Sequence, residues 1–110
     1  MRDDFDPGWI AQRVTIEKPV ATPDGAGGAS LAFDPVATVW AAIEPVAAVE
    51  TAAADRLVTT VSHKVTIRYR ADVGGGMRLR HRSRTLAIVA LRDPDEQRRF
   101  LVLDCREERS

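Results

Sequence analysis

The sequence is poor in several residue types that would point to common classes of protein. It has one cysteine, Cys105, which excludes an internal disulfide and a metal site built on several thiolates. Aromatic residues make up only 5% of the chain, so a core must be built mainly from Val, Ile, Leu and Ala. The longest apolar run, residues 86–91, is far short of the ~20 residues that span a bilayer. The acidic N-terminus has no apolar stretch typical of a secretory signal, so we expect a soluble protein made in the cytoplasm.

What remains has the composition of an ordinary globular protein. The chain has 110 residues, of which 45% are hydrophobic and 29% charged, and we expect residues 1–110 to form a single domain. The net charge is zero but unevenly spread. Residues 1–55 hold nine acidic and three basic residues, and residues 56–110 hold seven acidic and thirteen basic residues. The two halves either pair inside one domain or give the surface an acidic and a basic side.

Alternation of apolar and polar residues predicts a protein made mainly of β-strands. The clearest strand covers residues 61–70, where Val61, His63, Val65, Ile67 and Tyr69 alternate with polar side chains. On the last strand Leu101, Leu103 and Cys105 share one face, which predicts that Cys105 is a small buried hydrophobe. The other predicted strands lie at residues 10–17, 36–44, 77–82, 86–91 and 100–106. Residues 86–91 are apolar at every position, which favours burial on both faces, one of them against a neighbouring subunit.

Residues 47–57 break this β pattern. They are rich in alanine, lack Gly and Pro, and place Val49, Ala53 and Leu57 four residues apart, which indicates a short helix or a mobile excursion. The fold class that follows is mainly β. We predict a small antiparallel β-barrel of about six strands, with one short helical or loop excursion between the second and third strands.

The sequence offers little support for catalysis. His63 and His81 both fall on the inward face of a predicted strand, where a hydrogen-bonded structural role is favoured over a catalytic one. The glycine-rich segments 25–28 and 74–76 lack the Lys-Ser/Thr that follows a phosphate-binding loop. We therefore expect no enzyme, no catalytic residues, no metal and no cofactor.

Six arginines lie on or beside two of the predicted strands, mostly at a spacing of two: Arg68, Arg70, Arg78, Arg80, Arg82 and Arg84. If those strands pair, their outward faces form one basic patch. Three interpretations remain open: a surface that faces DNA, a docking surface for an acidic neighbour, or a solvated outer face with arginine favoured by a GC-rich genome. Aromatic residues that stack on bases are missing from this outward set, which weighs against recognition of single-stranded nucleic acid.

The order of segments resembles the phage head–tail joining family, also called head-closure or stopper proteins, of long-tailed phages and gene transfer agents. The resemblance runs from about Gln12 to Glu107 and is carried by WAAIEP at 40–45, HKVTIRYR at 63–70 and DPDE at 93–96. One departure is Ser83, where the family pattern has a turn glycine.

The resemblance implies a subunit of a six-fold or twelve-fold ring in the neck of a virion. Its partners would be identical subunits, a portal or adaptor protein above, a tail terminator or tail protein below, and packaged double-stranded DNA read without sequence specificity, with no membrane. In the family, the connection between the second and third strands projects into the channel and helps to retain DNA. Here that connection is residues 46–60, and the channel residues would be Val49, Glu50, Thr51, Asp55 and Arg56. The alternatives are a small nucleic-acid-binding barrel and a ring subunit of the tail-terminator type.

Overall fold

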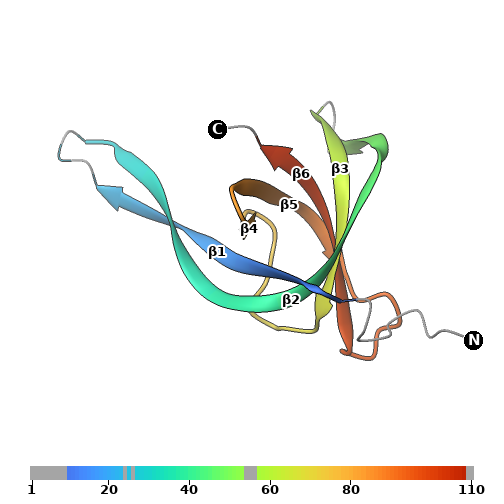
Figure 1. The fold of residues 1–110 in the computed structure, drawn as a ribbon. Coiled ribbons are helices and arrows are strands. Elements are labelled where there is room, and N and C mark those ends of the chain that lie inside the picture. The colour runs from blue at the N-terminus through green and yellow to red at the C-terminus, as the bar shows by residue number, and fades with distance from the viewer. Residues whose placement is uncertain (1–9, 24, 26, 54–56, 109–110) are drawn as a thin grey trace, which may run out of the picture.

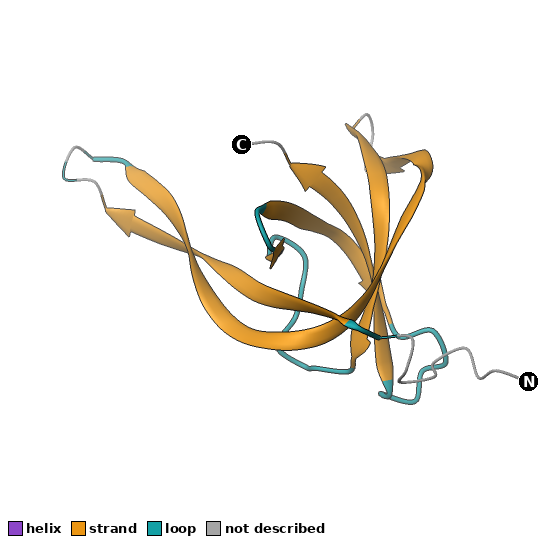
Figure 2. Ribbon diagram, in the orientation of Figure 1, coloured by secondary structure: helices purple, strands orange, loops and turns teal. Residues whose placement is uncertain are grey.

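The computed structural model describes residues 10–23, 25, 27–53 and 57–108, with the side chains of residues 29–30, 47–53 and 57–60 left out. Within this part the chain forms six β-strands: β1 (Gln12–Pro23), β2 (Ala29–Ala53), β3 (Leu57–Arg68), β4 (Arg78–His81), β5 (Arg84–Arg92) and β6 (Phe100–Glu108). The prediction of a mainly β fold with about six strands is confirmed (Figure 2). In the described part of the chain, no helix is long and apolar enough to cross a membrane.

All neighbouring strands pair antiparallel and close into a barrel in the order β1-β2-β3-β6-β5-β4. Figure 1 shows that β1 and β2 run on beyond the barrel as a long two-stranded ribbon, while β2 and β3 extend in another direction. The molecule is therefore elongated, with extents of 59 × 32 × 27 Å. The segments in which apolar and polar residues alternate form the body of the barrel. The ends of β1–β2 and of β2–β3 project from this body as two hairpins.

The inward side chains of every strand meet in one core. Val14 and Ile16 enter it from β1, Val65 and Ile67 from β3, and all are at most 1% exposed. The remaining buried members are Ala41, Val73, Met77, Leu79, Leu86, Ile88, Leu101, Leu103 and Cys105. The prediction for Cys105 is confirmed, since its thiol is fully buried and burial, with a smaller effect of Asp104, raises its pKa to about 12.

The prediction of a helical or loop excursion at residues 47–57 is wrong in its helical form. Residues 47–53 continue β2 and residue 57 begins β3, and the two strands pair from Val49 with Val61 to Ala53 with Leu57. An isolated helix of this length is only marginally stable. As part of β2, the backbone of residues 49–53 instead pairs with β3, which begins Leu-Val-Thr-Thr-Val, a sequence rich in β-branched residues that favour strands. The register shifts between Pro45 and Val49, next to a proline that has no N–H to donate.

In the single chain, the side chains of residues 86–89 on strand β5 alternate between the core and the outer side of the barrel. Leu86 and Ile88 point into the core at 0% and 4% exposure, while Ala87 and Val89 lie half-buried on the outer side. That outer side lacks the full burial that its uniformly apolar sequence favours. Its coverage by a neighbouring subunit stays a prediction.

The turn between β4 and β5 consists of Arg82 and Ser83. The left-handed residue of this turn is Arg82, with φ of 60°, whereas Ser83 has no positive φ. The turn therefore forms with serine at position 83, because the residue that needs a left-handed backbone here is Arg82.

Candidate interaction surfaces

The six arginines do not form the single patch that pairing of their strands would create. β3 and β4 are separated by two strands in either direction around the barrel. Arg68 and Arg70 therefore lie on one side of the barrel, and the four arginines from Arg78 to Arg84 lie on the other. Sequence reasoning failed here because neighbours in the chain need not be neighbours in a sheet that closes through long connections.

On the β4 side, two arginines are held by the fold and two are not. The Nε of Arg78 donates a hydrogen bond to Glu17 at 2.6 Å, and Arg84 donates to Glu107 from Nε at 3.1 Å. Arg80 and Arg82 are exposed and form no ion pair with any residue that the structure describes. These two side chains are the ones available to a partner.

On the β3 side, basic and aromatic side chains gather around Trp40, which is 52% exposed. The guanidinium of Arg13 lies 4.7 Å from the centre of the Trp40 ring, and that of Arg68 lies 5.8 Å from the Phe100 ring. Arg70 pairs with Asp72 at 2.9 Å. A hollow of about 280 Å³ opens here, lined by Val39, Trp40, Arg68, Tyr69 and Arg70. We did not single out Trp40 from the sequence, although its position out of phase with the inward Val39 and Ala41 is a signal for exposure.

Both histidines lie at one end of the barrel, half-buried rather than in the core. They line a cavity of about 400 Å³ together with Gln12, Ile43, Pro45, Arg82 and Arg84. Arg84 donates to His63 Nε2 at 2.8 Å, which leaves the His63 proton on Nδ1, 2.9 Å from Ser62 Oγ. This hydrogen bonding agrees with the structural role expected for His63.

The charge state of the two histidines follows from these surroundings. Burial, and then the nearby charge of Arg84, lower the pKa of His63. Burial, and then Arg82 and Arg84, lower the pKa of His81. His81 Nε2 is 3.1 Å from Gln12 Oε1, and its buried Nδ1 has no partner among the described residues. Both shifts favour the neutral form of the ring.

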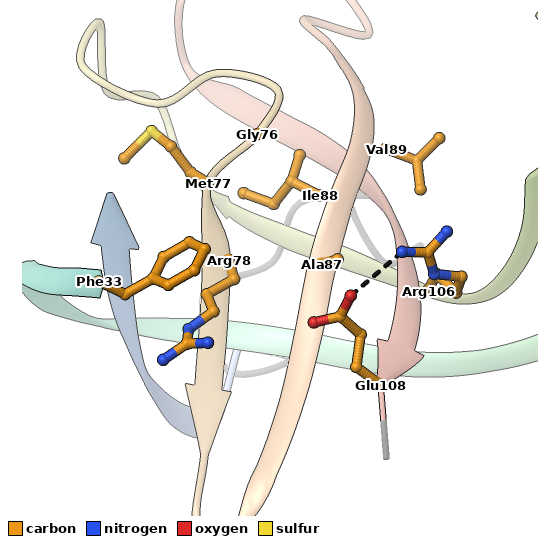
Figure 3. Close-up of a pocket in the computed structure, with 9 residues that line it drawn as sticks. All are labelled: Phe33, Gly76, Met77, Arg78, Ala87, Ile88, Val89, Arg106 and Glu108. Carbon is orange, nitrogen blue, oxygen red and sulfur yellow. Dashed lines mark hydrogen bonds and ion pairs between the residues drawn. The ribbon is translucent and has the colours of Figure 1, made fainter. Parts of the chain in front are cut away.

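Another cavity, of about 350 Å³, lies where the β1–β2 ribbon leaves the barrel wall (Figure 3). Phe33 of the ribbon stacks on Arg78 of β4, with 3.8 Å from the guanidinium carbon to the ring centre. Arg106 and Glu108 pair at 3.1 Å on the far side. The other lining residues are Gly76, Met77, Ala87, Ile88 and Val89. The half-buried apolar side of β5 therefore opens into this cavity.

Of the predicted channel residues, Val49, Glu50 and Thr51 lie on β2 and pair with Val61, Thr60 and Thr59. Asp55 and Arg56 lie outside the described residues. A metal-binding group of three or more His, Cys, Asp or Glu side chains does not occur among the residues described.

Comparison with known proteins decides the family. The profile of the phage head completion protein family matches residues 5–108. The chain belongs to this family. Among solved structures, a chain from the virion of a native gene transfer agent particle is 27% identical, with a TM-score of 0.64, covering 89% of this chain and 94% of that one. A protein of Shigella flexneri 2a, solved in solution, is 25% identical with a TM-score of 0.70, covering 94% and 96%. No curated protein sequence matches.

The resemblance seen in the sequence is thereby confirmed. As a member of this family, the chain is a structural component of a phage or phage-like particle and belongs in the virion.

Proposed function

We propose that the protein is a subunit of the connector ring in the neck of the particle. Six or twelve copies would form a ring that joins the portal or its adaptor to the tail, and the ring would help to retain the packaged double-stranded DNA. The observation that carries this proposal is the family match over residues 5–108, together with a gene transfer agent virion chain that covers nearly the same length.

The geometry of the subunit supports an assembly role. The barrel is closed, so its body has no free strand edge for uncontrolled pairing. Two hairpins leave the body in different directions (Figure 1). A ring needs two different surfaces on each copy that meet head to tail, and a compact body with projecting hairpins supplies such surfaces.

The β2–β3 hairpin is the candidate DNA gate. Its strands pair as far as Ala53 and Leu57, so it is a ribbon rather than a loose loop at these positions. A paired ribbon can project from the ring wall without a core of its own when neighbouring copies hold it. Arg80 and Arg82 are candidates for contacts with an acidic neighbour, because no carboxylate among the described residues neutralises them.

Electron microscopy of the particle neck, with this subunit located in the density, tests the proposal. We expect a closed ring between the portal side and the tail. A ring at the head end of the tail tube alone would favour the tail-terminator type instead. Absence from particles, with DNA binding that falls steeply as salt rises, would favour the free nucleic-acid-binding barrel.

A further inference from the structure

The part of the β1–β2 ribbon that extends beyond the barrel, residues 18–23 and 29–35, is here called the arm (Figure 1). In an antiparallel pair, residues directly opposite each other point to the same side. Pro19 pairs with Phe33 and Ala21 with Leu31, so one side of the arm is apolar. The other side is mixed, with Lys18 opposite Asp34 and Val20 opposite Ala32.

The apolar side of the arm is largely uncovered in the single chain. Leu31 is 64% exposed, and Pro19 and Ala21 are exposed as well. Among the described residues of the arm, Phe33 at its base is held against the barrel, where its ring stacks on Arg78. A two-stranded ribbon is at best marginally stable in water, and exposed apolar surface of this kind marks an interaction site.

The chain carries a surface that suits this arm. Among the residues with described side chains, the large hydrophobic residues that are exposed are Leu31 and Trp40. The Trp40 surface, made of Arg13, Trp40, Arg68, Tyr69 and Arg70, contains the hollow of about 280 Å³. That volume accommodates an aliphatic side chain, and Trp, Tyr and Arg are the residues that most often anchor protein interfaces.

The Trp40 surface also carries arginines that the described part of the subunit does not neutralise. Arg13 and Arg68 stack on aromatic rings and pair with no carboxylate in the part of the chain that the structure describes. On the arm, Asp34 and Lys18 lie opposite each other on the mixed side, away from Leu31. The Trp40 surface is thus apolar and basic, and the side of the arm that carries Leu31 is apolar and uncharged.

Leu31 cannot reach the hollow of its own chain. The two residues Leu31 and Trp40 lie nine positions apart on one strand, which corresponds to about 30 Å at about 3.3 Å per residue. A contact between them must therefore join two copies. Because the two surfaces differ, the contact is heterologous, as ring closure requires.

We propose that the arm of one copy packs on the Trp40 surface of the next copy, with Leu31 entering the hollow between Trp40 and Tyr69. This inference rests on the proposed ring and specifies which surfaces close it.

Cross-linking in assembled particles tests this contact. Ala21 neighbours Leu31 on the apolar side of the arm, and Arg70 borders the hollow, so the variant A21C/R70C leaves Leu31 and Trp40 in place. A short bis-maleimide should convert this variant into a ladder of covalent oligomers up to the full ring on a denaturing gel. Cys105 is buried and adds little background. Either cysteine alone should give no ladder.

Second-site changes make the test specific. Adding Leu31→Glu or Trp40→Glu should reduce the ladder by at least about tenfold, while Thr22→Glu, on the other side of the arm, should leave it intact. Both altered side chains are more than half exposed, so circular dichroism and melting should be unchanged. Particles that contain the cysteine pair without a ladder, a ladder that survives L31E, or dimers from A21C alone would each overturn the inference and leave the proposed function standing. A chain missing from wild-type particles would instead overturn the proposed function.

Discussion

Arg78 and Glu17 form the tightest ion pair between two strands, with 2.6 Å from Nε to Oε1, and their side chains are only 24% and 14% exposed. The same guanidinium lies 3.8 Å from the centre of the Phe33 ring. One arginine on β4 therefore links β1 of the barrel to the base of the arm. Both of these contacts of Arg78 lie within the subunit.

The Arg78 contacts predict a loss of stability on substitution. Arg78→Ala should lower the free energy of unfolding by about 1–3 kcal/mol, because it leaves the half-buried Glu17 carboxylate without its partner and removes the stacking on Phe33. Urea denaturation measures this change. Arg80→Ala, two residues along the same strand and exposed, is the matched control and should change it by less than about 0.5 kcal/mol. Equal effects of the two variants would contradict the structural role of Arg78.

The β4–β5 turn gives a second stability prediction. Arg82 holds φ of 60°, which costs an L-residue about 1 kcal/mol that glycine does not pay. The free energy of unfolding of Arg82→Gly should therefore equal that of the wild-type chain or exceed it by up to about 1 kcal/mol. Ser83→Gly relieves no strain and adds chain entropy to the unfolded state, so it should lower stability by about 0.5–1 kcal/mol. Denaturation curves with the opposite order would place the left-handed residue at Ser83.

The histidine cavity predicts a dependence of stability on pH. Burial and neighbouring arginines lower the pKa of His63 and His81 in the folded state below the ordinary value of 6.5. Their contribution is therefore complete above that value and is lost as the pH falls through the lowered pKa values, because the unfolded chain binds the protons first. The free energy of unfolding should decline as the pH falls below 6.5. In His63→Gln, which stays neutral, the decline should be shallower, and an unchanged slope would show that His63 is not responsible.

The sequence was sufficient to predict the strands of the barrel body but not their neighbours. Residues 61–70 alternate so regularly that β3 follows directly, and the burial of Cys105 follows from its phase with Leu103. The separation of β3 from β4 depends on strand order, which local patterns do not encode. The alanine-rich segment was misread because helix propensity is a weak prior that a partner strand overrides. The apolar side of the arm became visible only with the pairing of Ala21 and Leu31.

Arg80 provides a test of the basic surface that spares the fold. It is exposed, lies between Thr15 and Thr85, and pairs with no carboxylate in the described part of the chain. Arg80→Glu should leave the melting temperature unchanged and lower the yield of completed particles about tenfold or more, if the residue meets an acidic neighbour. Arg98→Glu, the same charge reversal in the exposed loop between β5 and β6, is the control. Normal yields from Arg80→Glu would leave this side of the barrel as a solvated face.

We expect that the β2–β3 hairpin can be shortened without disturbing the barrel, which allows the proposed gate to be tested directly. Removing residues 51–59 and joining Glu50 to Thr60 through Asn-Gly keeps their pairing and closes it with a favoured two-residue turn. We expect rings that assemble normally on filled heads that then lose their DNA, measured as DNase-sensitive DNA per particle. The same operation on the arm, removing residues 21–31 and joining Val20 to Ala32, should instead keep the subunit out of the ring. DNA that stays protected behind a ring of shortened hairpins would mean that residues 51–59 do not hold it, and would turn attention to the ring wall itself as the barrier.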